Sequence, residues 1–264
     1  MEIRLLERDN DKGKLSFLIK DTNPAFVNFL RNVITSKVPT LAIENVEFRK
    51  NNTVLYDEII AHRIGLIPIK TDLNSYELPE ECSCKGKGCA KCGLKMTLMA
   101  NSPGIVYSAK LKSKDPKAVP VSENIPIVKL LKGQALQLEA TAVLGRGEVH
   151  AKWSPGLAYY KYKPIITILK EPKDPQKVVD SCPLKIFKIK DNKLLVDKDV
   201  LMKCSLCEAC VETSNGDIKS EETDKEFVFY VESWGQLDCR EIVINALDIF
   251  QRELDEFVKG FEKK

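Results

Sequence analysis

Three cysteines at a strict spacing of three residues constrain this chain more than any other feature of its sequence. The stretch KCSLCEAC, residues 203–210, contains Cys204, Cys207 and Cys210. A C-x-x-C-x-x-C run wraps one short loop around a cuboidal iron–sulfur cluster, whereas two C-x-x-C pairs far apart are typical of zinc. The spacing therefore predicts a metal centre in this loop, with an iron–sulfur cluster as the first interpretation and zinc as the second.

A fourth thiol is available upstream of this loop. Cys182 is followed by Pro183, and ferredoxin-like sites add a remote cysteine of this kind. In two-cluster sites the loop continues with a further cysteine, but Ser214 stands at the equivalent position, so one cluster is expected. Four thiol ligands would hold a 4Fe–4S cluster. Loss of the corner iron, or of the Cys182 ligand, would leave a 3Fe–4S form.

A second group of cysteines lies in ECSCKGKGCAKC, residues 81–92. Four thiolates on a short Gly/Lys loop can close tetrahedrally around zinc, and the neighbouring lysines offset the excess negative charge. The alternative is two disulfides that staple the loop. In a reducing cytosol clustered thiols are more often metal ligands, although hyperthermophiles are an exception. We therefore expect a structural zinc ion, with the candidate ligands Cys82, Cys84, Cys89 and Cys92.

The overall charge and hydropathy exclude several classes of protein. The 264 residues carry a net charge of only +3, and basic and acidic residues alternate along the chain. This distribution lacks the clustered basic face of a nucleic-acid binder, so no direct contact with nucleic acid is expected. No apolar run is long enough to span a membrane, and the start, MEIRLLERDNDKGK, is too polar for a signal peptide. We expect a cytoplasmic protein with no membrane partner.

Alternation of apolar and polar residues predicts several strands. They are expected at residues 14–20, 41–48, 53–58, 104–111, 135–145, 164–169 and 227–233. Residues 70–100 differ in character and are rich in Lys, Gly and Cys. Residues 167–225 also contain cysteines and are polar, and we expect them to be rich in loops.

Three helices are predicted from capping signals. Asn23 is the expected cap of the first, which Pro39 stops, and Asp57 is the expected cap of a short second helix at EIIAHRI. The D-x-x-E pattern of Asp238 and Glu241 begins a long final helix. The first and last helices have broad apolar faces and adjoin alternating strands. A sheet formed by the two chain ends would carry both, and these faces would either pack in the core or bind a partner.

The sequence offers no catalytic machinery of its own. It contains no G-x-G-x-x-G after a strand, no phosphate-binding loop and no tight aspartate cluster for catalytic magnesium. His62 and His150 lie in unrelated contexts, and each is more often a structural residue than a base. An electron-transfer protein would need a second redox group, for which no motif is present. The chain is therefore interpreted as a folded platform with two metal sites.

Two stretches resemble the signatures of the RNA polymerase assembly subunits. One runs from NPAFVNFL to GLIPI, residues 23–69, and the other is GEVHAKWSPGLAYYKYKP, residues 147–164. The tail FVFYVESWGQLDCREIVINAL also fits this family. The family includes the bacterial alpha subunit, the third-largest subunit of eukaryotic RNA polymerase II and the archaeal D subunit. The ferredoxin-like insertion makes the chain most similar to the archaeal members of the family.

The resemblance implies an α+β fold with three parts. A discontinuous dimerisation domain would be built from both chain ends, residues 1–39 and 226–264. A β-rich domain, residues 40–166, would be inserted between them and would contain the cysteine loop at 82–92. A ferredoxin-like domain, residues 167–225, would bind the iron–sulfur cluster.

The resemblance also implies a role and partners. The chain would be a non-catalytic subunit of a DNA-directed RNA polymerase, a nucleotidyltransferase complex, and would pair with a smaller subunit L. The heterodimer would serve as the assembly platform for the large catalytic subunits, and the inserted domain would also dock small subunits N and P. The candidate contact residues are Phe26, Phe29, Leu30, Val33, Leu247, Phe250, Leu254 and Phe257. The competing hypothesis is an iron–sulfur protein for electron transfer or redox sensing.

Overall fold

A computed structural model describes residues 1–262 of the chain. Those residues form a mixed α/β structure with several sheets, in agreement with the predicted α+β class. The chain divides into two compact units. The first contains Met1–Glu7, Ser16–Asn28 and Tyr159–Tyr230, and the second contains the remaining described residues. The finer division into three domains stays a prediction.

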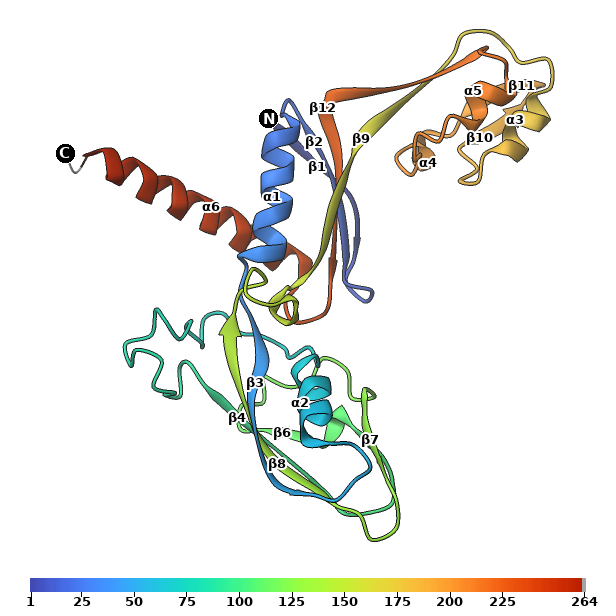
Figure 1. Ribbon diagram of the computed structural model, residues 1–264. Coiled ribbons are helices and arrows are strands. Elements are labelled where there is room, and N and C mark those ends of the chain that lie inside the picture. Colours follow the sequence, from blue (N-terminus) through green and yellow to red (C-terminus); the bar gives the residue numbers. More distant parts are fainter. Residues whose placement is uncertain (263–264) are drawn as a thin grey trace. The chain divides into compact units, whose positions relative to one another are not determined.

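The main sheet of the first unit joins strands from both ends of the chain (Figure 1). Its order is β1 (Glu2–Asp9), β2 (Lys14–Lys20), β12 (Ile218–Ser233) and β9 (Gly156–Ile168). Consecutive residues of β2 and β12 are buried here, and the rings of Phe17 and Phe229 stack at 5.2 Å between centroids. The expected sheet between the two chain ends is thereby confirmed.

The strand β1 was not predicted from the sequence. Its residues EIRLLERD are mostly exposed, with charged side chains on both faces. β1 lies at the edge of the sheet, where a strand needs no continuous buried face. The alternation that reveals β2 and β12 is for this reason absent here.

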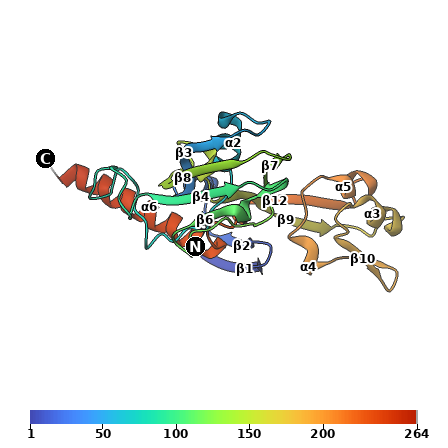
Figure 2. The same ribbon diagram turned by 90° about the horizontal axis from the view of Figure 1, so that it is seen from below.

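The cysteine-bearing segment, residues 169–217, connects two neighbouring strands of the main sheet. It leaves at the end of β9 and returns at the start of β12, where the N–H of Leu169 donates to the Asp217 carbonyl at 2.9 Å. It contains more regular structure than the sequence predicted. Its elements, which gather beyond the ends of β9 and β12 in Figure 2, are α3 (Pro175–Ser181), β10 (Phe187–Lys190), β11 (Lys193–Val196), α4 (Lys198–Leu201) and α5 (Ala209–Thr213).

The larger sheet of the second unit is built from strands within residues 40–145. Its order is β3 (Thr40–Asn51), β8 (Leu136–Gly145), β4 (Leu94–Ala100) and β6 (Leu111–Ser113). A two-stranded sheet of β5 (Gly104–Tyr107) and β7 (Pro126–Leu130) and the helix α2 (Asp57–Gly65) complete this part. Short 3-10 turns follow at Ser108–Lys110 and Ala151–Trp153. Alternate residues of β8 are fully buried in the core, which explains why its pattern was readable.

Two expectations for this region were wrong, and one strand was not predicted. Residues 53–58 form no strand, because the Asn51 side-chain amide donates to Leu55 O and Asp57 Oδ1 and closes a turn there. Tyr56, with extended backbone, is the N-cap of α2, so Asp57 is its first residue rather than its cap. Within residues 70–100, for which no strand was predicted, LKMTLMA forms β4, one of the two inner strands of the sheet.

The first and last helices begin as predicted. The Asn23 carboxamide oxygen accepts from the N–H of Phe26 at 2.9 Å and caps α1 (Pro24–Ser36). Asp238 Oδ1 accepts from the N–H of Arg240 at 2.8 Å and caps α6 (Cys239–Glu262). The rings of Phe29 and Phe250, 4.5 Å apart between centroids, join these two helices. None of the helices within residues 1–262 combines the length and apolar character that a membrane span requires.

The indole of Trp153 packs directly on the end of β8. Its Nε1 donates to the Val143 carbonyl at 3.2 Å, and its own carbonyl accepts from the Thr40 hydroxyl at 2.8 Å. A Cβ placed on Gly145 would lie 2.4 Å from the indole ring, closer than side-chain atoms can approach. Glycine at 145 is therefore required by the position of the Trp153 ring.

We expect Gly145→Ala to lower the free energy of unfolding by about 1–3 kcal/mol, because the ring and strand must separate. Gly260→Ala is the matched control, since Gly260 lies in α6 with no atom near the added methyl group. That change should be neutral or stabilising by about 0.5–1 kcal/mol. Urea unfolding followed by tryptophan fluorescence measures both, and equal stability of the two variants would refute the packing argument.

Candidate metal centres and partner surface

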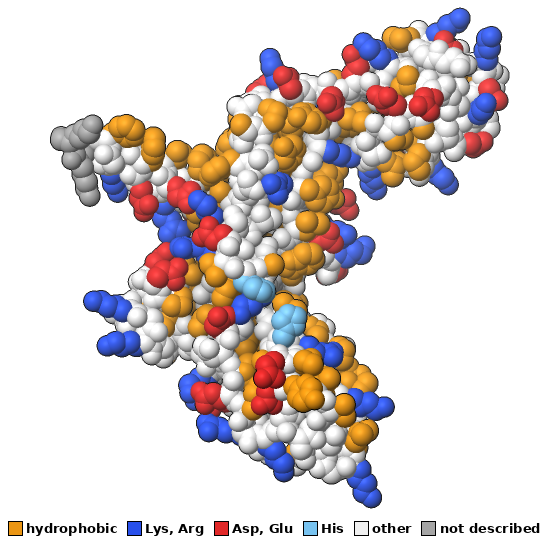
Figure 3. Space-filling view, in the orientation of Figure 1, with side chains coloured by type: hydrophobic (Ala, Val, Ile, Leu, Met, Phe, Trp, Pro, Cys, Tyr) orange, Lys and Arg blue, Asp and Glu red, His pale blue; other side chains and the backbone are white. Residues whose placement is uncertain are grey.

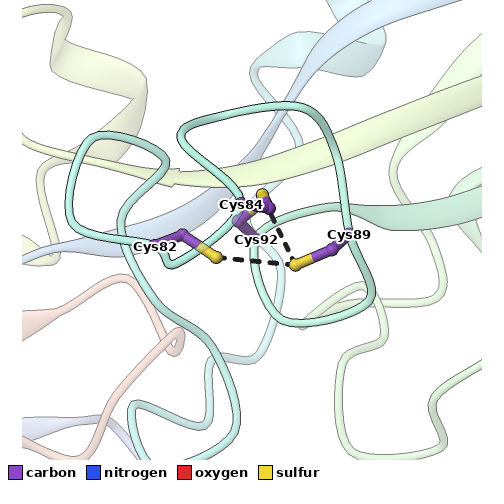
Figure 4. A group of neighbouring side chains, drawn as sticks. All are labelled: Cys82, Cys84, Cys89 and Cys92. Carbon is purple, nitrogen blue, oxygen red and sulfur yellow. Dashed lines mark hydrogen bonds between the residues drawn. The ribbon is translucent and has the colours of Figure 1, made fainter.

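The four cysteines of residues 82–92 converge on one point (Figure 4). Their Sγ atoms all lie within 4.8 Å of one another, at 3.5 Å for Cys82–Cys89, 3.4 Å for Cys84–Cys92 and 3.8 Å for Cys89–Cys92. A tetrahedral ion with metal–sulfur bonds of about 2.3 Å needs sulfurs roughly 3.8 Å apart. Bonded sulfurs would be about 2.05 Å apart. The arrangement fits four free thiols around one metal ion.

Tight turns in the loop produce this convergence. The N–H of Lys85 donates to Cys82 O at 2.8 Å, and the N–H of Cys92 donates to Cys89 O at 3.1 Å. Gly86 and Gly88 between them have φ of 74° and 84°, a left-handed conformation that glycine adopts without strain. The Lys/Gly composition that marked this loop in the sequence thus has a geometric reason.

Ion pairs at the edges fasten the loop to its surroundings. Arg146, just after β8, reaches Glu80 at 3.2 Å and Glu81 at 2.6 Å, and Lys91 pairs with Glu77 at 3.1 Å. Such exposed pairs each contribute little, about 0–1 kcal/mol. They do restrict the chain on both sides of the thiols.

The four thiols do not ionise alike. The N–H of Cys89 and the thiol of Cys92 lower the pKa of Cys84 to about 6. For Cys82 the N–H of Cys84 is the largest single influence and lowers the pKa, but burial and the neighbouring thiols together raise it to about 12. Burial also raises the pKa of Cys92. One thiolate is therefore available near neutral pH, and a nearby cation would favour ionisation of Cys82 and Cys92.

Three of the four predicted cluster ligands share one apolar core. Cys182, Cys204 and Cys210 are buried together with the residues Val178, Ile186, Phe187, Leu194 and Ile218, whereas Cys207 is exposed. Burial raises the pKa of Cys204, and the nearby charges of Cys207 and Cys182 raise it further. Burial and the charges of Cys204 and Cys182 do the same for Cys210. The structure thus brings three of the four predicted ligands into one core, and Cys207 lies outside it.

The backbone around Cys207 fits a loop that wraps a metal group. Leu206 and Glu208, on either side of it, have φ of 55° and 61°, a left-handed conformation that costs non-glycine residues about 1–2 kcal/mol each. The N–H of Leu206 donates to the Sγ of Cys204 at 3.4 Å, as amides do to cluster sulfurs. A four-iron cluster is larger than one ion, so its ligands need not approach as closely as those of the 82–92 loop.

Two contacts to this loop were not anticipated. Lys161 Nζ donates to the carbonyl of Cys204 at 2.8 Å, and the Tyr230 hydroxyl donates to the carbonyl of Met202 at 3.2 Å. Both side chains come from the paired strands β9 and β12. No local pattern marks them, because each acts on residues far away in the sequence.

The predicted partner residues differ in exposure. Leu30 and Val33 on α1 are buried core residues, and Phe26, Phe29 and Phe250 are half-buried. On α6 the exposed fraction is 38% for Leu247, 42% for Leu254 and 66% for Phe257. Apolar side chains follow one side of α6 in Figure 3, and charged side chains follow another. The outer part of α6 therefore presents an apolar face.

The second signature stabilises the chain itself. Lys152 Nζ donates to Ile43 O at 3.0 Å, pairs with Glu44 and lies 4.4 Å from the centre of the Trp153 ring. His150 Nδ1 accepts from the N–H of Lys152 at 3.0 Å, and its ring packs edge-on against Trp153. These contacts agree with the structural role expected for His150.

Comparison with known proteins identifies the class first. Residues 44–156 match the family model described as the RNA polymerase Rpb3/RpoA insert domain. This region of the chain is thus an insert domain of the kind found in RNA polymerase subunits.

Relatives match almost the whole chain. The chain is 37% identical over 268 residues to DNA-directed RNA polymerase subunit Rpo3 of Methanosphaera stadtmanae, covering 98% of this chain and 97% of the relative. It is 40% identical over 262 residues to the Methanosarcina mazei subunit of the same name, with the same coverage. For the Pyrococcus furiosus subunit the identity is 38% over 266 residues, covering 100% and 98%. The chain belongs to the family of archaeal RNA polymerase subunit Rpo3, the D subunit of the older nomenclature, as its signatures predicted.

We expect the 82–92 loop to bind one divalent ion less tightly as pH falls, because each thiol must lose its proton to become a ligand. The loss should steepen below about pH 6, where Cys84 also takes up a proton. Competition with a coloured chelator over a pH series measures this, and elemental analysis identifies the ion. Cys84→Ser should remove the steep part, and pH-independent binding would argue against thiolate ligands.

Proposed function

We propose that this chain is a non-catalytic assembly subunit of archaeal DNA-dependent RNA polymerase. It pairs with a small subunit L, and the heterodimer is the platform on which the large catalytic subunits assemble. The observation that carries this proposal is the exposed apolar face of α6 in a chain that matches polymerase subunits end to end. Such a face, on a helix anchored by buried residues, is typical of a partner surface.

The exposure pattern divides seven of the eight candidate contact residues by role. Leu30 and Val33 are buried in the core beneath α1, and Phe29 packs on Phe250 to join α1 and α6. Leu247, Leu254 and Phe257 are left for subunit L. Partner residues from a second apolar helix would remove these side chains from water, at about 25 cal/mol for each Å² buried.

The remaining parts fit the same proposal. The two chain ends, residues 1–39 and 226–264, form the dimerisation domain. The inserted domain, residues 40–166, docks subunits N and P and the large subunits, with zinc at Cys82, Cys84, Cys89 and Cys92 as a structural staple. Residues 167–225 form the cluster domain, in which Cys182, Cys204, Cys207 and Cys210 hold a 4Fe–4S or 3Fe–4S cluster. A metal group there adds folding energy to a segment with a small apolar core.

One observation favours the alternative of an electron-transfer or redox-sensing protein. Cys207, a predicted cluster ligand, is exposed, and exposure of one ligand would give an electron partner access to the cluster. An anaerobic pull-down of the tagged chain from its own cells separates the two functions. Co-purification of a small subunit and the large polymerase chains supports the platform. Recovery of soluble reductases without polymerase chains supports the alternative.

We expect Phe257→Asp to reduce capture of subunit L by at least roughly tenfold, because a charge would be buried against an apolar partner. Lys259→Gln is the matched control. It also lowers the net charge by one, and Lys259 is exposed on the opposite side of α6 from Phe257. Quantitative pull-down with purified subunit L compares the two. Equal capture by Phe257→Asp and wild type would remove α6 from the interface.

Cys204→Ser should abolish the iron–sulfur absorption and unfold residues 167–225, while the chain ends stay folded and bind subunit L. Hydrogen exchange resolves this by segment, since amides of α3 and α5 would lose protection and those of α6 would keep it. The control is Cys239→Ser, because Cys239 is a buried thiol outside both sets that donates to Gly13 O at 3.0 Å. Loss of subunit L from the Cys204 variant would contradict the separation of the two functions.

A further inference from the structure

The paired strands β9 and β12 have two chemically different faces. On one face Tyr160 and Tyr162 pack against Phe227 and Phe229, and both phenylalanines are fully buried. On the other face β9 presents Tyr159, Lys161 and Lys163 in succession, because alternate residues of a strand point the same way. A lysine in the middle of a strand ladder, between two other polar positions, would ordinarily extend into water.

Lys161 instead turns toward the cysteine loop. Its side chain is half-buried, its Nζ donates to Cys204 O at 2.8 Å, and the same Nζ lies 5.6 Å from the centre of the Tyr230 ring. The Tyr230 ring stacks on Tyr159 at 4.8 Å, and its hydroxyl donates to Met202 O at 3.2 Å. Two adjacent side chains of the sheet thus grip two backbone carbonyls at the start of the C-x-x-C-x-x-C run.

We infer that Lys161 and Tyr230 are positioning residues for the cluster loop, and that the Lys161 ammonium offsets the negative charge of the cluster through its contact with Cys204. This inference rests on the proposed iron–sulfur centre. A cluster core held by four thiolates is net negative, and its reduction potential depends on nearby charge and hydrogen bonds. Lys161 brings a positive charge to a ligand residue at a partly desolvated site, where a charge acts more strongly than in water.

A purely structural lysine would have a different consequence. If Lys161 only tied the loop to the sheet, its loss would loosen residues 202–210 but leave the potential of any remaining cluster unchanged. Charge compensation predicts a change in potential as well. The reduced cluster carries one more negative charge than the oxidised cluster, so a nearby cation favours the reduced form.

The test is a redox titration of the full chain, purified without oxygen and followed by electron paramagnetic resonance. Lys161→Met keeps the length of the side chain and removes its charge, so the midpoint potential should become more negative. Lys161→Arg should return it toward the wild-type value. Lys163→Met is the matched control, because Lys163 lies two residues along the same face but pairs with Glu226. An unchanged midpoint in Lys161→Met, or an equal shift in Lys163→Met, overturns the charge role.

Positioning is tested separately by release of iron to a chelator. Loss of one charge-assisted hydrogen bond in Lys161→Met should make release roughly tenfold faster. Tyr230→Phe removes only the hydroxyl that holds Met202, so it should speed release while leaving the midpoint near wild type. Wild-type release rates in both variants would overturn the positioning role.

Iron binding by the wild-type chain distinguishes failure of the proposed iron–sulfur centre from failure of the roles inferred for Lys161 and Tyr230. A wild-type chain that binds no iron refutes the cluster, and with it the charge role of Lys161. The grip on the backbone carbonyls is still decided in that case by hydrogen exchange of residues 202–206 in the metal-free chain. Faster exchange in Lys161→Met than in Lys163→Met supports the grip, and equal exchange overturns it.

Discussion

Hydrogen bonding between β9 and β12 is the constraint on which the rest of the first unit depends. β12 also pairs with β2, so the same ladder joins the beginning and the end of the chain. The segment between the two strands begins and ends at Leu169 and Asp217, which are joined by a backbone hydrogen bond. Because Lys161 and Tyr230 stand on this ladder, the cysteine loop is tied to the sheet by side chains as well as by chain connection.

Thiols complete the core where apolar side chains are few. The core of the cysteine segment counts three cysteines among its buried residues, next to a small number of aliphatic side chains. In the 82–92 loop the thiols stand at the centre of two tight turns that have little apolar content. Four ionised thiols in such a small volume repel one another, and a metal group reverses the sign of that interaction. Ordering of both segments and ionisation of their cysteines are therefore linked.

Local signals in the sequence predicted several elements that contribute to the core. β2, β8 and the last part of β12 were evident from alternation, and the caps Asn23 and Asp238 located the starts of α1 and α6. β1 has no buried face and so no pattern. The turn after β3 was mistaken for a strand because its apolar residues alternate with polar ones. Val54 and Tyr56 are in fact exposed, so this pattern does not mark a buried face.

The candidate sites were predictable to different degrees for the same reason. Cysteine spacing is a local property, and it identified both thiol groups. The contacts of Lys161 with Cys204, and of Trp153 with Gly145, join residues whose proximity depends on the folded sheet. The distinction between buried Leu30 and exposed Phe257 likewise follows from which part of each helix another element covers. Helical periodicity alone shows that a helix has an apolar face, but it does not show which part of that face another element buries.

The exposed face of α6 has a consequence for the life of the chain in the cell. Leu254, Phe257 and Phe261 are exposed to water in the chain alone. Surfaces of this kind are what chaperones and proteases recognise, and they also favour aggregation. Synthesis in excess of the covering protein would then yield molecules destined for degradation. Under the proposed function, such degradation would match the abundance of the chain to that of its complex without any dedicated regulator.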